Sequence, residues 1–338
     1  MAPRPKRSDG SAGPQPRQLG LFGPEPAADD RLVAKVAPAA VPDDVQRLAA
    51  RLPPELRLGT SSWSFAGWRG LVYAPDAPKA HLSRHGLGAY AQHPLLRTVG
   101  VDRTFYAPIA ADEFAAYAAQ VPASFRFLVK ALGELLSPQR PGGAELNPRY
   151  LDGAAFLREC VEPARLGLGP RLGTLLLQFP PQGPEVVRDP RRFADRLHGF
   201  LGRVPLEVPC AVELRDAELF TPHYRDALRA LGVQHAYTVH PRMPSLSRQR
   251  ELVPLDGPLV VRWMLHQGLA YEAAVERYEP FDRLVDPDPA TRSGIAALVH
   301  HALQQSRAVT VVVNNKAEGS SPCSVLALAQ AIVALLPE

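Results

Sequence analysis

Charged and amide side chains stand at the ends of several strongly apolar segments of this chain. The segments FRFLVK, TLLLQFPP, CAVELR, LVVRW and VTVVVNN are strand-like for four or more residues and then reach polar groups. These polar groups are Lys130, Gln178, Glu213, Arg215, Arg262, Asn314 and Asn315. Lysine and glutamate can exchange protons with a bound molecule, whereas arginine and amide groups can hold a carboxylate or phosphate. The pattern predicts a site for an anionic ligand where these strand ends meet.

The apolar segments themselves indicate how the site is positioned. Continuous runs of Val, Leu and Ile are typical of strands buried on both faces, as in a parallel sheet covered by helices. From Arg57 onward such runs alternate with helical segments, and eight strand segments can be counted. Alternation implies βαβ units with right-handed crossovers, and eight of them favour a TIM-type (β/α)8 barrel of the α/β class. In that barrel the active site lies at the carboxyl ends of the strands.

An open doubly wound sheet is the competing architecture. It would bind a dinucleotide through a glycine-rich turn after its first strand. The first strand here is followed by GTSSWSFAGWRG, which lacks the G-x-G-x-x-G spacing. The barrel is therefore the predicted fold, and the motifs leave the cofactor unknown.

Composition divides the chain of 338 residues into two parts. Residues 1–52 are rich in Pro, Ala, Gly, Arg and Asp without a sustained period, which predicts a disordered basic arm. Residues 53–338 are predicted to form one barrel domain. A formal net charge of +4 weakly favours anionic ligands but is not by itself a nucleic-acid signature.

Cysteine usage and hydropathy bear on the compartment. Cys160, Cys210 and Cys323 are odd in number and far apart, without the paired spacing of zinc sites or disulfide frameworks. No apolar stretch approaches the roughly 20 residues of a membrane span, and the amino terminus lacks the apolar core of a signal peptide. We expect reduced thiols and a cytoplasmic protein.

Three residues are candidates for catalysis. Glu213 lies two positions from Arg215 on one strand, so both side chains share a face and would form an ion pair. The pair is either structural or a carboxylate kept ionised as a general base. Lys130 ends a buried strand, where it would anchor an anion or act as an amine base or nucleophile. Asp102 would be its acid/base partner or, alternatively, a turn carboxylate.

Other residues near the strand ends are candidates for ligand binding. Their side chains offer hydroxyls, aromatic faces, amides or a guanidinium group. They are Thr60, Ser62, Trp63, Tyr106, Gln178, Arg215, Arg262, Asn314 and Asn315. Each also has a structural alternative, because Trp is commonly buried in the core, Arg pairs internally, and Asn and Gly supply turns. The helix after Asn315 would favour an anion at its first N–H groups.

The amino-terminal arm contains one short apolar motif. Gln18, Leu19, Leu21 and Phe22 form QLGLF, which resembles the QLxLF motif that docks bacterial DNA-processing proteins into the sliding clamp. Short extended motifs bind by inserting a few anchors and ordering on contact. The alternative is a chance match. Nearby basic residues would suit a location close to nucleic acid.

Six sequence blocks, in order, resemble the YecE-like family, also called domain of unknown function 72. They are GTSSWSFAGWRGLVY at 59–73, TVGVDRTFY at 98–106, FRFLVKA at 125–131, LGTLLLQFPP at 172–181, AVELR at 211–215 and NNKAEGSSP at 314–322. The resemblance covers nearly everything after residue 56. It implies a TIM-type barrel distantly similar to sugar isomerases and apurinic endonucleases, with no established activity.

The chain departs from the family pattern in three places. Where the family typically has Glu and Asn, this chain has Gly100 and Asp102. The His that usually follows E-x-R is Asp216, and the R-x-H motif ends on Met264. A mechanism that needs either histidine is therefore in doubt, although His266 is a hypothetical substitute.

Metal binding is a weaker hypothesis. His81 and His85 have i,i+4 spacing, but no HExxH-type glutamate lies between them. His235, His240 and His266 would have to converge with Glu213 and Asp102 to hold an ion. Because the spacing does not establish this, no metal site is predicted.

Overall fold

The computed structural model describes residues 36–140, 143, 145–205 and 207–337, and these form a closed barrel of eight parallel strands. Each strand pairs with the next in sequence, and the last pairs with the first. The strands are β1 (Leu56–Thr60), β2 (Leu96–Val101), β3 (Arg126–Lys130), β4 (Leu172–Gln178), β5 (Cys210–Glu213), β6 (Gln234–Val239), β7 (Leu259–Trp263) and β8 (Val309–Val313). The predicted barrel is confirmed, and the open sheet is wrong for this chain.

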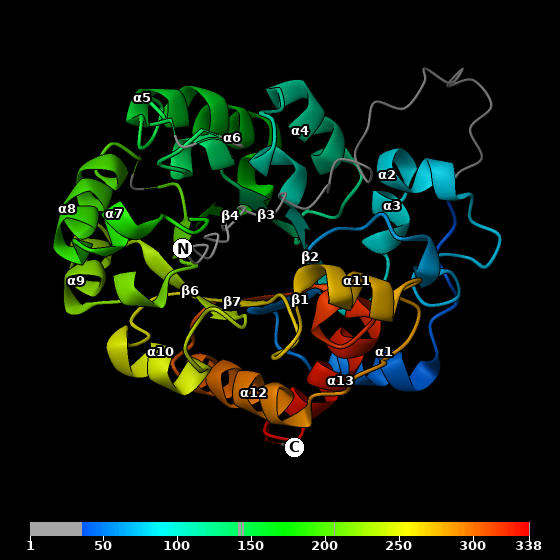
Figure 1. Ribbon diagram of the computed structural model, residues 1–338. Helices are drawn as coiled ribbons and strands as arrows, with labels where there is room; N and C mark the ends of the chain where they lie inside the picture. Colours follow the sequence, from blue (N-terminus) through cyan, green and yellow to red (C-terminus); the bar gives the residue numbers. More distant parts are fainter. Residues whose placement is uncertain (1–35, 141–142, 144, 206, 338) are drawn as a thin grey trace, which may run out of the picture.

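Helices surround the ring of strands (Figure 1). They are α1 (Asp43–Ala50), α2 (Leu82–His85), α3 (Leu87–Tyr90), α4 (Ala111–Ala119), α5 (Gly153–Phe156), α6 (Glu162–Leu168), α7 (Pro184–Val187), α8 (Pro190–Leu201), α9 (Pro222–Ala230), α10 (Leu246–Leu252), α11 (Tyr271–Tyr278), α12 (Pro289–Gln304) and α13 (Ser321–Val333). A π-helical turn, Leu157–Val161, joins α5 to α6. None of the helices within these described ranges has the length and apolar character needed to cross a membrane.

Helix α1 corrects the predicted extent of the amino-terminal arm. We assigned residues 1–52 to a disordered segment, yet the last part of it is helical and buries Val45 and Ala49. The guanidinium of Arg97 at β2 donates to the carbonyls of Ala49, Leu52 and Pro53 and fastens the helix to the barrel. Because α1 is short and flanked by prolines, the helical spacing of its apolar residues is not sustained enough to predict a helix. Residues 1–35, including the QLGLF motif, lie outside the described residues.

Side chains inside the barrel are stacked in layers. A cluster of six buried apolar residues is separate from the core that the helices cover, and we call it the apolar layer. Its members are Leu128, Leu176, Ala211, Ala236, Val260 and Val312. Because successive residues of a strand point to opposite faces, positions two residues further along also point inward. The apolar layer thus closes the middle of the barrel and fixes which polar residues lie above it.

The next layer toward the carboxyl ends is polar. Counting two residues onward from the apolar layer gives Lys130, Gln178, Glu213, Thr238, Arg262 and Asn314. Asn314 Nδ2 donates to Ser61 Oγ of the β1 end at 2.8 Å, which places Ser61 in the same layer. The predicted convergence of the strand ends therefore follows from strand alternation around a closed barrel.

Strands β1 and β2 approach each other closely because glycines face the interior. A Cβ atom on Gly59 would lie 1.9 Å from the carbonyl oxygen of Thr98, and one on Gly100 would lie 3.0 Å from that of Ser61. Outside the barrel, the Tyr90 hydroxyl donates to the same Thr98 carbonyl and bonds to Thr60. The close approach of Gly59 to the Thr98 carbonyl requires glycine at position 59.

We expect Gly59→Ala to lower the free energy of unfolding by about 3 kcal/mol, because the backbone of β2 cannot yield without breaking the β1–β2 pairing. Urea denaturation of the purified variants measures this change. Gly199→Ala in α8 is the matched control, since nothing lies within 4 Å of its added Cβ. The control is expected to gain about 0.5–1 kcal/mol from helix propensity. Equal stability of the two variants would contradict the packing described for Gly59.

Candidate functional site

Glu213 is the buried centre of the carboxyl-end polar layer. Its side chain is fully buried and forms ion pairs with both Arg215 and Arg262. The Nη1 atom of Arg262 donates to Oε2 at 2.6 Å. Burial alone would raise the pKa of Glu213, but Arg215 and Arg262 outweigh burial and hold it at about 2. The expected Glu213–Arg215 ion pair is therefore present, and Glu213 is a weak base at neutral pH.

Arg262 has N–H donors that make no hydrogen bond to the described residues. Its side chain is fully buried, and its Nη2 lies 3.6 Å from Asp102 Oδ1, which is an ion-pair contact but too long for a hydrogen bond. Neither Nε nor Nη2 of Arg262 has a hydrogen-bond partner in the described part of the chain. Because unpaired buried N–H groups are costly, they are natural donors to a bound oxyanion.

Two buried lysines flank this arginine. Lys130, at the end of β3, lies with Nζ 4.2 Å from the ring centroid of Phe105. Lys316 follows β8, and its Nζ lies 4.5 Å from the ring centroid of Tyr271. Burial lowers the pKa of each lysine to about 8, while the nearby Asp102 opposes part of that shift. Both amines can thus lose or hold a proton near physiological pH.

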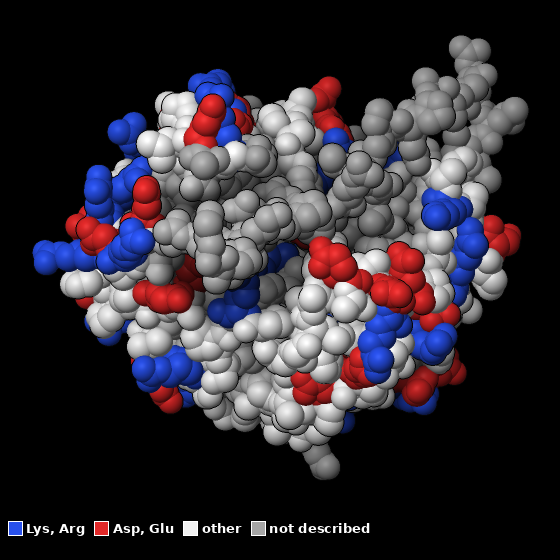
Figure 2. Space-filling model, viewed as in Figure 1, with Lys and Arg blue, Asp and Glu red and all other residues white. Residues whose placement is uncertain are grey.

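The charges of this site do not balance among the described residues. Four cationic side chains, Lys130, Arg215, Arg262 and Lys316, share the strand ends with two carboxylates, Asp102 and Glu213. Two positive charges are left over. Figure 2 shows Lys and Arg side chains in a hollow at the centre of the face that carries α11. A hollow lined by excess positive charge attracts anions.

The asparagines at the end of β8 shape a loop. Asn314 Oδ1 accepts from the backbone N–H of Lys316 at 3.0 Å. Asn315 Oδ1 accepts from Trp68 Nε1 at 3.2 Å and from the N–H and hydroxyl of Ser321 at the start of α13. Both asparagines therefore have the structural role in the turn that was the alternative to ligand binding. Their effect on the site is indirect, because they hold the loop that carries Lys316.

The residues at the ends of β1 and β2 have mixed environments. Thr60 is fully buried and its hydroxyl bonds to Tyr90 outside the barrel, which is a structural arrangement. Trp63 is also buried, but with Ser62 and Asp102 it lines a pocket of about 50 Å³. Tyr106 is 47% exposed at the rim, and burial, followed by the charge of Asp102, raises its pKa to about 12.

Gln178 lies beside the centre of the site. It is half-buried at the end of β4 and pairs in register with Glu213 of β5. Its side-chain amide makes no hydrogen bond within the described ranges, so it remains available to a ligand. The geometry thus places Gln178 with Glu213, Arg262 and Lys130, as the alternation of strand residues predicted.

The histidines do not converge on a metal site. His235 is buried and bonds to the Tyr224 hydroxyl and to Gln249. His266 Nδ1 lies 2.7 Å from the carbonyl oxygen of Gln267. His240, after β6, lies near the charged residues, and burial, then Arg215, lowers its pKa to about 4. Within the described ranges, no three His, Cys, Asp or Glu side chains are grouped as a metal ion would require.

Lys316 and Phe105 were not among the predicted site residues. One signal identifies the lysines: only five of the 38 Lys and Arg residues are lysines, at positions 6, 35, 79, 130 and 316. A chain that uses arginine almost throughout places two of its lysines in the barrel mouth. Unlike arginine, lysine can release its proton when buried.

The fold and the site together define a closed (β/α)8 barrel with an ionised, partly unpaired cluster at its carboxyl ends. The chain belongs to the family described as protein of unknown function DUF72, whose sequence model matches residues 57–336. The resemblance seen in the sequence blocks is thereby confirmed. No protein of the curated set matches the chain.

Solved structures of the same family share the fold. A DUF72 family protein from Enterococcus faecalis V583 superposes with a TM-score of 0.55 at 18% identity, covering 84% of this chain and 97% of that protein. A DUF72 family protein from Thermotoga maritima MSB8 gives a TM-score of 0.51 at 20% identity, with 81% and 96% covered. At these identities the likeness extends to the fold alone.

The lowered pKa of Lys130 has a consequence for stability. Because the folded-state pKa lies below that of the unfolded chain, the folded state binds fewer protons between about pH 8 and 10.5. The free energy of unfolding contributed by this group therefore rises with pH in that window. We expect Lys130→Met to gain stability relative to the wild type below pH 8, by on the order of 3 kcal/mol, and to lose that gain by pH 10.5.

Urea denaturation at several pH values measures this difference, with Lys79→Met at an exposed position as the matched control. A stability difference between Lys130→Met and wild type that is the same at pH 7 and pH 10.5 would show that the Lys130 amine is not desolvated.

Proposed function

We propose that this chain is an enzyme that binds an anionic sugar- or nucleotide-containing molecule at the carboxyl mouth of the barrel. The single observation that carries the proposal is the buried Arg262 guanidinium, whose Nε and Nη2 have no hydrogen-bond partner among the described residues and lie beside an excess of positive charge. A carboxylate or phosphate of the ligand would accept from these two donors and balance the charge.

The rim of the mouth supports a ring-containing ligand. Phe105, Tyr106 and Tyr271 lie around the two lysines, and two of their rings already contact an ammonium group. Aromatic faces bind the apolar faces of sugars and the planes of bases. Gln178 and Ser62 would add polar contacts to hydroxyl groups. The rim therefore suits a ligand that joins a ring to an anionic group.

The chemistry that fits this arrangement is proton transfer. Lys130, with a pKa of about 8, can act as acid or base near neutral pH, whereas Glu213, with a pKa of about 2, holds its two arginines in place. Asp102 lies between Arg262 and the lysines, where it tunes the Lys130 amine. General acid–base catalysis by such a group contributes on the order of 10²–10⁴ in rate. An isomerase- or hydrolase-type reaction is consistent with these roles.

A screen of sugar phosphates and nucleotides by thermal shift and calorimetry tests the proposal. For any compound that binds, we expect Lys316→Met and Lys130→Met to weaken affinity by about tenfold or more, because each variant removes a charge-assisted contact. Lys79→Met at the surface is the matched control and should bind as the wild type does. Failure of every anionic compound to bind would contradict the proposal, as would unchanged affinity in both mouth variants.

A second candidate function rests on the amino-terminal motif alone. We propose that Gln18, Leu19, Leu21 and Phe22 dock the chain onto a bacterial sliding clamp, which would place the barrel near DNA. The motif supplies one polar residue and three apolar anchors in five positions, which is enough for recognition by an apolar pocket. This role is compatible with the enzyme proposal.

The docking proposal predicts that purified clamp retains the full-length chain in a pull-down assay. Leu21→Ala combined with Phe22→Ala should abolish retention, because the apolar anchors are removed. Leu32→Ala with Val33→Ala, a matched apolar pair outside the motif, should leave retention unchanged. Equal retention of wild type and the motif variant would refute this role without affecting the enzyme proposal.

A further inference from the structure

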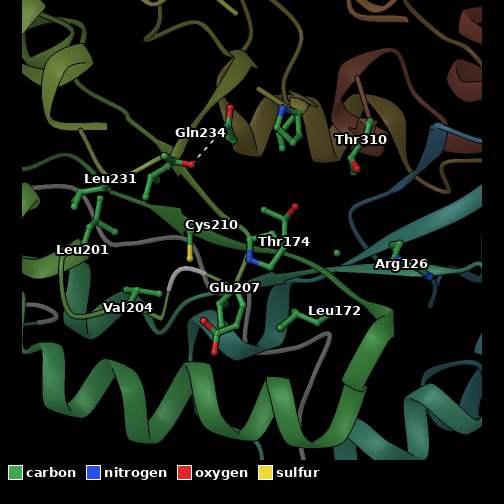
Figure 3. A pocket seen from close by; sticks show the side chains of 18 of the residues that line it. Arg126, Leu172, Thr174, Leu201, Val204, Glu207, Cys210, Leu231, Gln234 and Thr310 are labelled. Atoms are coloured by element: carbon green, nitrogen blue, oxygen red, sulfur yellow. Dashed lines mark hydrogen bonds between the residues drawn. The ribbon is translucent and has the colours of Figure 1, made fainter. Parts of the chain in front are cut away.

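A second cavity lies at the amino-terminal end of the barrel, opposite the candidate active site. It has a volume of about 660 Å³, within the range of ligand-binding pockets. Its wall comes from the first residues of several strands and from the loops that enter them. Figure 3 shows Arg126, Thr174, Gln234 and Thr310 of four different strands around this space. The cavity is thus formed by the strand starts together with the loops after α8 and α9.

The apolar layer separates this cavity from the carboxyl mouth. Positions two residues before that layer include Arg126, Thr174, Gln234 and Thr310, which are therefore the inward-facing residues at the amino-terminal end. Val260 of the apolar layer forms part of the cavity wall. A ligand bound here would be separated from Lys130 and Glu213 by packed side chains, so the two sites are independent.

Two arginines line the cavity, and the carboxylate of Glu55 acts on the charge of Arg57 without reaching ion-pair distance. Arg57 and Arg126 are half-buried, and neither forms an ion pair with a carboxylate among the described residues. Burial, followed by the charge of Arg126, lowers the pKa of Arg57, so the two guanidinium groups are close enough to repel each other. The Glu207 carboxylate also lines the cavity but is exposed and pairs with neither arginine. An anion placed between them would relieve this repulsion.

The arginines have donors available for such an anion. Arg126 uses Nη1 for the carbonyls of Ala123 and Phe125, and Arg57 makes one long contact from Nη1 to the Glu55 carbonyl. The remaining guanidinium nitrogens of both residues make no hydrogen bond within the described ranges. Each guanidinium group can therefore still donate to a planar oxyanion.

The rest of the wall is largely apolar with a few hydroxyls. Leucine, valine and proline side chains dominate it, including Leu172, Leu201, Val204, Leu231 and Val233. The hydroxyls of Thr174 and Thr310 have no hydrogen-bond partner in the described part of the chain. A ligand that fits must therefore combine an anionic end with a hydrocarbon body.

We propose that this amino-terminal cavity binds a small amphipathic carboxylate, with its charged end at Arg57 and Arg126 and its hydrocarbon chain along the leucine and valine wall. The site is distinct from the carboxyl mouth and does not depend on the function proposed there. Binding would stabilise the folded barrel, because only the folded chain brings β1 and β3 together.

Isothermal titration calorimetry of the full chain with sodium octanoate tests this site, with octan-1-ol as the neutral analogue. We expect octanoate to bind at least tenfold more tightly than octanol. Arg57→Gln and Arg126→Gln, made separately, should each weaken octanoate binding by tenfold or more. The matched control is Arg165→Gln, which is exposed on α6 and does not line the cavity. Its affinity should equal that of the wild type.

Thermal melts of each variant show whether it is folded, and either arginine variant alone is sufficient for the test. The proposal is overturned if octanoate does not bind, if octanol binds equally well, or if both arginine variants retain wild-type affinity. It is also overturned if Lys316→Met, at the other end of the barrel, abolishes octanoate binding, because the carboxylate would then occupy the carboxyl mouth.

Discussion

The ion pair between Glu213 and Arg262 is the constraint on which the carboxyl end of the barrel depends. Both side chains are fully buried, so each must keep a partner of opposite charge. Arg215 and Arg262 each form an ion pair with one carboxylate oxygen of Glu213, and this pairing together with burial anchors the Arg262 guanidinium through its Nη1. Its unused Nε and Nη2 are thereby held in a defined direction before any ligand arrives, and such preorganisation lowers the cost of binding.

The same strand alternation that buries this pair gives the barrel two separate polar ends. Small and branched side chains fill the apolar layer, and Gly59 and Gly100 let β1 and β2 close the ring beside it. Polar residues then appear on both sides of the layer, as lysine, glutamate and arginine at one end and as arginine and threonine at the other. In barrels of this architecture, chemistry is built on the carboxyl-end loops, while the amino-terminal end is usually devoted to stability.

Much of this arrangement could be predicted from the sequence, because continuous apolar runs and their polar ends are local features. The eight strands and the meeting of Lys130, Glu213 and Arg262 were predicted on that basis. The partners that give Thr60 and Asn315 their structural roles could not be, since Tyr90 and Trp68 lie 30 and 247 residues away. Helix α1 was missed because its amphipathic period extends over only eight residues between prolines and is not sustained. Lys316 was not predicted as a site residue because it follows two asparagines in a segment typical of a turn.

The central claim is that the carboxyl mouth holds an anion between Arg262 and the two lysines. A crystal structure of the full chain soaked with inorganic phosphate tests it most directly. We predict phosphate density within hydrogen-bond distance of Arg262 Nη2 and of at least one lysine Nζ, with the Glu213 ion pairs unchanged. Phosphate bound only elsewhere on the molecule, with the Arg262 donors occupied by protein groups, would contradict the account.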